Sequence, residues 1–219
     1  MTDPSIILAS GSPRRAELLR MLRIPFEVAE PDVDERPATG ESPQAQAERL
    51  ARDKADVVGR RFPGRWVLAG DTIVVLAGDV LGKPGSREEA VTMLLRLQGR
   101  SHRVASGVAV HGPTGHLRSG VEETTVTFRP FTREEAEAYV ATGEPMDKAG
   151  AYGIQGLGAA LVERVEGDFF GVMGFPLILL LRLLREEGLD YRFGAWSQGS
   201  ERASRVQDGQ EATTGREEE

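Results

Sequence analysis

The 219-residue chain contains no cysteine and only three histidines. The absence of cysteine excludes disulfides, thiolate metal sites and a cysteine nucleophile. It is also typical of a reducing compartment, so we expect a cytoplasmic protein. No two of the histidines, at positions 102, 111 and 116, have the helical spacing of metal ligands. A zinc site is therefore not expected, and any metal should be a hard cation held by carboxylates.

Long hydrophobic runs and an excess of positive charge are also missing. The apolar run over residues 175–181 stops at Arg182, far short of the roughly 20 residues of a membrane span. The first ten residues lack the basic flank and apolar stretch of a secretory signal. The net charge of −7 makes nucleic acid an unsuitable partner, because binding its backbone needs a basic face. A small anionic substrate stays a candidate if a few cations gather in one cleft.

Lysine is scarce, since only Lys54, Lys83 and Lys148 are lysines among 27 basic residues. One interpretation is a genome-wide drift to arginine, with three lysines left over. The other is that these positions need a compact ammonium. Lys54 follows Leu50 by four residues and precedes Val57 by three, on the apolar face of a predicted helix, where a solvated lysine is out of place. We therefore expect at least two of the lysines to line an anion site.

Hydrophobic periodicity and capping residues predict alternating strands and helices. Strands are predicted at 5–10, 25–36 in part, 66–76, 80–81, 102–128 and 159–166, and helices at 12–22, 42–60, 86–99, 132–143 and 176–187. The hairpins exclude an all-parallel sheet, so we predict an α/β fold with a mixed twisted sheet and flanking helices. Residues 1–196 should form a single domain, and we expect a disordered polar tail over residues 197–219.

The segment that joins the first strand to the first helix is a candidate phosphate cradle. Ser10, Ser12, Arg14 and Arg15 surround the predicted helix start. A helix N-terminus offers free amide donors and the positive end of a dipole. The alternative is an ordinary helix capped by Ser12 and carrying two solvated arginines.

Two carboxylates are candidates for acid–base chemistry or metal binding. Asp71 interrupts a β-branched apolar run, where a carboxylate is costly unless it is paired, metal-bound or functional. The alternative is a strand bulge at which Asp71 accepts hydrogen bonds from backbone amides. Glu35 ends the acidic segment 32–35, which by itself suggests a solvated loop. Together the two could hold Mg²⁺ or Mn²⁺, because such sites combine one or two carboxylates with substrate phosphates.

The glycine-rich segment over residues 147–158 is a third candidate. Glycines let a backbone approach a ligand closely, but this pattern is not the dinucleotide fingerprint, so an oxidoreductase of that type is not expected. A plain flexible loop is the alternative. Gln155 is the side chain in this segment that both donates to and accepts from a base edge. Combined with the cations and carboxylates, the pattern favours metal-assisted attack of water on a phosphate ester or anhydride.

Several motifs resemble those of the Maf family of nucleoside triphosphate pyrophosphatases. They are LASGSPRRAELL, ERLARDKA, AGDTIVVL with GKP, and DKAGAYGIQG with GFPL, and the resemblance spans about residues 6–187. It implies a fold like that of inosine triphosphate pyrophosphatases, with two lobes around a deep cleft. It also implies hydrolysis of a nucleoside triphosphate to its monophosphate and pyrophosphate, with a divalent metal. Asp71 then matches the base that activates water, and further matches to the phosphate and metal site are Ser10, Arg15, Glu35, Lys54 and Lys83.

The substrate branch follows from three positions of the resemblance. Arg14, Thr72 and Gln155 look like the branch that acts on dTTP and UTP, whereas the branch for 7-methylguanosine triphosphate tends to carry an aromatic, Gln and Glu there. Asp147 and Lys148, which open the glycine-rich motif, are further candidate substrate-binding residues. The alternatives are a pyrophosphatase for modified or purine triphosphates, and a non-catalytic regulator of septum formation, after the division arrest that names the family. Relatives of this fold are often dimers, so a homodimer stays open.

Overall fold

The computed structural model describes residues 5–198, which form a mixed α/β structure. Seven strands make one sheet in the order β2-β1-β3-β5-β6-β7, with β4 paired to β3. The pairs of β1 with β2 and β3 are parallel, and the other pairs are antiparallel. The strands are β1 (Ile6–Leu8), β2 (Glu27–Val28), β3 (Trp66–Leu76), β4 (Asp79–Leu81), β5 (Ser101–His111), β6 (Leu117–Phe128) and β7 (Val162–Glu166).

Six α-helices and three short 3₁₀ helices flank this sheet within the described residues. The α-helices are α1 (Pro13–Met21), α2 (Pro43–Arg61), α3 (Arg87–Leu97), α4 (Arg133–Ala141), α5 (Phe169–Val172) and α6 (Leu177–Glu186). The 3₁₀ helices are η1 (Glu144–Asp147), η2 (Ala149–Ala151) and η3 (Leu157–Leu161). The predicted mixed sheet with flanking helices is thus confirmed. None of the helices described here is both long and apolar enough to cross a membrane.

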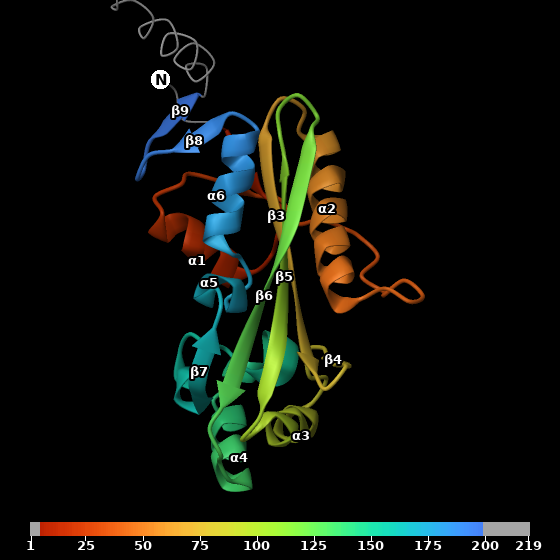
Figure 1. Ribbon diagram of the computed structural model, residues 1–219, viewed down its shortest axis with the longest axis vertical. Helices are drawn as coiled ribbons and strands as arrows, with labels where there is room; N and C mark the ends of the chain where they lie inside the picture. Colours follow the sequence, from red (N-terminus) through yellow and green to blue (C-terminus); the bar gives the residue numbers. More distant parts are fainter. Residues whose placement is uncertain (1–4, 199–219) are drawn as a thin grey trace, which may run out of the picture.

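Three long antiparallel strands form the backbone of the molecule. β3 and β5 have 11 residues each and β6 has 12. Figure 1 shows α2 and α6 on opposite sides of these strands, with α3 and α4 at their lower end. Apolar side chains from both sides bury the strands, and the largest cluster includes Leu68, Val108 and Val126. Residues in the middle of β3, β5 and β6 therefore lie between the helices that flank the sheet.

The close packing of α2 on the sheet depends on Gly107. A Cβ atom at this position would lie 2.2 Å from the backbone oxygen of Ala47, much closer than any real contact. Gly107 therefore lets the backbone of α2 rest directly on β5. Asp71 of β3 stands opposite Gly107 in the sheet register, and Lys54 follows Ala47 by two turns of α2. The glycine thus helps to place Lys54 over Asp71.

Several local predictions need correction. The strand predicted over residues 159–166 begins at Val162, because the 3₁₀ helix η3 takes up the residues before it. The helix α5 and the strand pair of β8 (Leu189–Tyr191) and β9 (Trp196–Gln198) were not predicted. The predicted polar tail begins inside β9, since residues 197–198 belong to that strand. The rest of that tail, 199–219, lies outside the described residues.

Candidate active site

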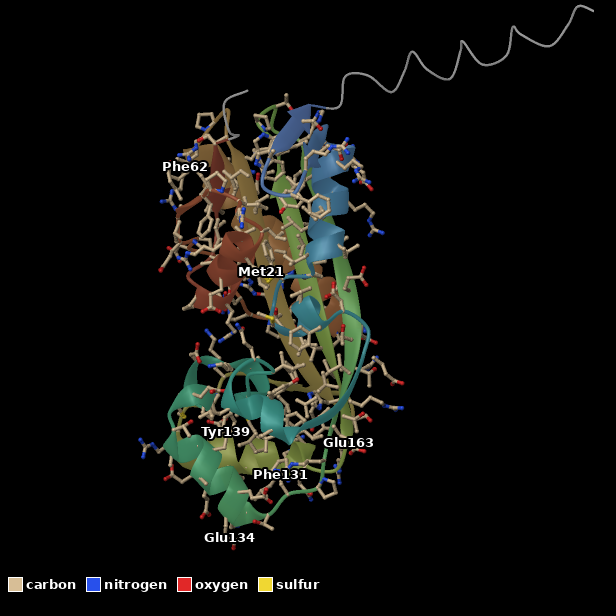
Figure 2. All side chains as sticks on the ribbon, turned by 90° about the vertical axis from the view of Figure 1, so that its left-hand side faces the viewer. Met21, Phe62, Phe131, Glu134, Tyr139 and Glu163 are labelled. Atoms are coloured by element: carbon tan, nitrogen blue, oxygen red, sulfur yellow. The ribbon has the colours of Figure 1, made fainter. Side chains whose placement is uncertain are left out.

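All twelve residues singled out in the sequence line one cleft of about 810 Å³, a size typical of small-molecule sites. They come from α1, α2, β3, the loops before α1 and α2, the loop after β4 and the segment 147–158. They are Ser10, Ser12, Arg14, Arg15, Glu35, Lys54, Asp71, Thr72, Lys83, Asp147, Lys148 and Gln155. Figure 2 shows α1, which carries the labelled Met21, above the segment with the labelled Tyr139, while the long strands run beside both. The folded chain therefore brings together residues up to 145 positions apart in the sequence.

Lys54 joins two carboxylates at the centre of the cleft. Its Nζ lies 2.6 Å from Glu35 Oε1 and 2.7 Å from Asp71 Oδ1. The Lys54 and Asp71 side chains are only 9% and 13% exposed, whereas that of Glu35 is 64% exposed. The hydrogen bond from Lys54 holds the pKa of Glu35 below its usual value, and the charges of Lys54, Lys83 and Arg15 act in the same direction. Two carboxylates from separate parts of the chain therefore contact the same ammonium group.

Asp71 does not sit at a strand bulge, so that alternative is wrong. The register of β3 with β5 runs without interruption through Asp71 and Thr72, which face Gly107 and Ser106. The Asp71 carboxylate is instead neutralised by Lys54 from the neighbouring helix. The cost of a carboxylate in an apolar strand is thus offset by a charge pair.

Arg15 carries its charge without a carboxylate partner. Its Nε donates to the Gly174 oxygen at 2.8 Å, its Nη1 to Ser10 Oγ at 2.8 Å, and its Nη2 to Thr72 Oγ1 at 3.4 Å. No carboxylate of residues 5–198 lies within the 4.0 Å of an ion pair. Burial lowers the pKa of the Arg15 guanidinium. A half-buried guanidinium held by neutral acceptors favours an anion in the cleft.

The start of α1 opens into the same region. Ser12 occupies the N-cap position, as predicted, but its side chain forms no capping hydrogen bond. The Ser12 backbone N–H instead donates to Ser10 Oγ at 3.2 Å. The first turn of α1 contains no acidic residue. The Ser10 hydroxyl and the positive end of α1 therefore lie beside Arg15.

Lys83 and Lys148 add two more cationic side chains to the lining of the cleft. Lys83 follows β4 and is exposed, and it makes no hydrogen bond or ion pair with the described residues. Lys148 Nζ lies 2.6 Å from Asp147 Oδ1 and also donates to the Glu144 oxygen. All three lysines of the chain thus line the cleft. Five cationic side chains face four carboxylates there, although the whole chain has a net charge of −7.

The segment 147–158 contacts α1 directly. Arg14 Nη1 lies 3.1 Å from Asp147 Oδ2, and Gln155 Nε2 donates to Glu17 Oε2 at 3.1 Å. Partial burial opposes ionisation of Asp147, but Lys148 and Arg14 still lower its pKa. These contacts join two parts of the chain that are more than 130 residues apart.

Two residues that the sequence analysis missed fix the backbone of this segment. Glu144 Oε1 accepts from the Tyr139 hydroxyl at 2.8 Å and from Gly158 N at 3.1 Å, and its Oε2 accepts from Leu157 N at 2.9 Å. Gly153 N donates to the Tyr139 hydroxyl oxygen at 3.1 Å. The segment is therefore held in place instead of being a plain flexible loop. The backbone N–H groups of a glycine-rich segment need hydrogen-bond acceptors. A glutamate three residues before the segment could therefore have been noticed as a candidate acceptor.

Glu35 and Asp71 are the residues suited to hold a divalent cation. Both approach one ammonium closely, so the space between them already accommodates positive charge. Carboxylates are hard donors, and Mg²⁺ commonly uses one or two of them with substrate phosphates and water. Within residues 5–198, no group of three or more His, Asp or Glu side chains is placed to hold a metal. The donor set therefore fits a cation whose other ligands come from substrate and water.

Comparisons with known proteins place the chain in a family. It is 54% identical over 183 residues to a dTTP/UTP pyrophosphatase of Symbiobacterium thermophilum, covering 84% of this chain and 94% of that protein. It is 51% identical over 184 residues to a dTTP/UTP pyrophosphatase of Myxococcus xanthus, covering 84% and 93%.

Among solved structures, a nucleoside-triphosphatase, dITP/XTP pyrophosphatase, of Mycobacterium abscessus is 21% identical with a TM-score of 0.37. That match covers 57% of this chain and 74% of the other. The sequence profile described as "Maf-like protein" matches residues 5–187, nearly the whole described structure. The chain therefore belongs to the family of Maf-like proteins.

Proposed function

We propose that this chain is a nucleoside triphosphate pyrophosphatase that hydrolyses dTTP and UTP to the monophosphate and pyrophosphate. Relatives that share about half of its residues carry this name. The observation that carries the proposal is Arg15, a half-buried cation that forms no ion pair with residues 5–198, beside the carboxylates that flank Lys54. Such an arrangement suits a polyanionic substrate that is attacked next to its charged groups.

The cations and the start of α1 would bind the triphosphate. Arg15 and Lys83 offer charge that no carboxylate of residues 5–198 takes up in an ion pair, and Ser10 and Ser12 add hydroxyl donors. Lys148 on the facing loop would contact the distal phosphates. Donors held before the substrate arrives stabilise charge that develops during the reaction without reorganising.

Asp71 would act as the general base. It accepts the proton of a water molecule whose oxygen forms a bond to the α-phosphorus, while the bond from that phosphorus to the bridging oxygen breaks and pyrophosphate leaves. Lys54, 2.7 Å from Asp71, would keep the carboxylate oriented, and Arg15 would offset charge on the leaving group. A Mg²⁺ or Mn²⁺ ion held by Glu35 and Asp71 would, when bound, neutralise phosphate oxygens.

Gln155, Thr72 and Arg14 would shape the base pocket. Gln155 presents one carbonyl oxygen and two N–H donors, which match the carbonyls and the N–H of a uracil or thymine edge. Asp147 lies on the same wall and is joined to Arg14. These contacts support a pyrimidine preference, while hydrolysis of purine or 7-methylguanosine triphosphates is the alternative outcome.

The test is pyrophosphate release from a panel of nucleoside triphosphates with Mg²⁺ or Mn²⁺, with Asp71→Asn as the blank. We expect release from dTTP and UTP, and at least about a thousandfold loss in the blank because the base is gone. Asp71→Asn should keep its far-ultraviolet circular dichroism. Release only from purine nucleotides would overturn the pocket assignment. No release from any nucleotide would overturn the enzymatic proposal and leave a regulatory role in division.

A further inference from the structure

The side-chain amide of Gln155 is hydrogen-bonded to a carboxylate of helix α1. Gln155 Nε2 lies 3.1 Å from Glu17 Oε2, and both side chains belong to exposed residues at the rim. An ionised carboxylate only accepts hydrogen bonds, so the amide group that faces it must be the NH₂ end. The contact therefore determines which end of the amide points toward Glu17.

The backbone on both sides of Gln155 is held in place. Glu144 and Tyr139 hold the backbone on both sides of it, through Gly153, Leu157 and Gly158. The side-chain amide could still rotate by half a turn with little change in packing, because its two ends have nearly the same shape. A residue that fixes this rotation therefore fixes the hydrogen-bonding pattern that position 155 offers to a ligand.

Glu17 is itself held at the right place by its helix. It follows Arg14 by three residues, so the two lie on the same face of α1. From that face, Arg14 reaches Asp147 at 3.1 Å and Glu17 reaches Gln155 at 3.1 Å. Two contacts of opposite polarity thus align α1 with the two ends of segment 147–158. This arrangement keeps the Glu17 carboxylate beside Gln155.

We propose that Glu17 is a positioning residue that sets the base specificity by fixing the amide of Gln155. The inference rests on the proposed pyrophosphatase function and deepens it. With one N–H given to Glu17, Gln155 keeps a carbonyl oxygen and one N–H for the base. That oxygen accepts from the N3–H of uracil or thymine. Cytosine has a lone pair at N3, which would face the same oxygen and repel it, so cytosine needs the rotated amide.

The test compares wild type with Glu17→Gln, whose side chain has the same size but can either donate or accept. The amide of Gln155 is then free to rotate, and we expect the ratio of kcat/KM for UTP over CTP to fall about tenfold. The ratio for UTP over dTTP should stay constant, since both bases present the same edge. A purely structural role of Glu17 would lower all three values together and leave both ratios unchanged.

Two further variants keep the outcome decisive. Glu17→Ala removes the carboxylate without supplying a new partner and should lower the UTP/CTP ratio in the same way. Glu137→Gln removes an exposed helix carboxylate that pairs with Arg133 far from the cleft, and should leave both ratios at the wild-type value. Thermal unfolding confirms that each variant is folded.

The possible outcomes separate the two proposals. A wild-type enzyme that hydrolyses UTP well above CTP, with the same ratio in Glu17→Gln and Glu17→Ala, overturns the role of Glu17 and leaves the proposed function intact. Equal use of UTP and CTP by the wild type does the same. A wild type that releases pyrophosphate from neither UTP nor dTTP overturns the proposed function and this inference with it.

Discussion

The charge triad of Glu35, Lys54 and Asp71 makes a quantitative prediction about stability. Lys54→Met keeps an unbranched side chain of similar length but removes its charge, which leaves the largely desolvated Asp71 facing Glu35 without a cation. Breaking a buried ion pair costs about 3–5 kcal/mol. Because the Glu35 side chain is 64% exposed and can turn into solvent, we expect the lower value, about 3 kcal/mol.

For a chain of this size, that loss lowers the unfolding midpoint by about 6–12 °C. The assay is thermal unfolding followed by circular dichroism at pH 7 and near pH 4.5. The difference from wild type should shrink at the lower pH. There, protonation of Glu35 relieves its repulsion with Asp71 in the variant, while the wild type begins to lose the stabilisation that comes from the lowered pKa of Glu35. The sign follows because a carboxyl with a lowered pKa stabilises the fold only while it is ionised.

Lys83→Met is the matched control, since Lys83 is exposed and forms no ion pair with residues 5–198. It should unfold within about 2 °C of wild type at pH 7, as expected for a surface substitution. Equal midpoints for Lys54→Met and Lys83→Met would refute the reasoning. The triad would then contribute nothing measurable to the fold.

Two other predictions concern packing and pH. Gly107→Ala places a methyl group 2.2 Å from the Ala47 oxygen, so we expect a loss of about 3 kcal/mol from displacement of α2. An unchanged unfolding midpoint would show that α2 moves freely on the sheet. Burial lowers the pKa of His102 to about 4, so the unfolded chain binds its proton more readily, and stability should fall by about 3 kcal/mol between pH 6.5 and 4. His102→Phe should flatten this part of the stability profile, and identical pH profiles of the two proteins would contradict the assignment.

The central charges of the site could be predicted because they break local rules. Lys54 stood on the apolar face of its helix, and Asp71 interrupted an apolar strand, so each required a partner that the sequence alone could not name. The structure shows that they are partners of each other. Charges in disfavoured places therefore carried most of the predictive information.

Contacts that depend on packing could not be predicted. Glu17 looked like an ordinary exposed helix residue, and its link to Gln155 spans 138 positions. The 3₁₀ helix η3 escaped prediction because five residues that include one glycine and two alanines show no hydrophobic periodicity. Ser106 was overlooked because a serine in a strand is common. Its hydroxyl group lies 3.2 Å from Thr72 Oγ1 and donates to the Gly171 oxygen at 2.6 Å.

The long strands have a consequence for how a ligand enters. β3 and β5 pass the cleft without a break in pairing from Val67 to Val75, so no loop is available there as a hinge. Opening by rotation of one half of the molecule would require the sheet itself to bend. We therefore expect the cleft to keep a constant width, so that side chains at its rim, such as Arg14 and Gln155, control which ligands enter. A cleft of constant width excludes ligands that are too large before they can form any hydrogen bond through their base.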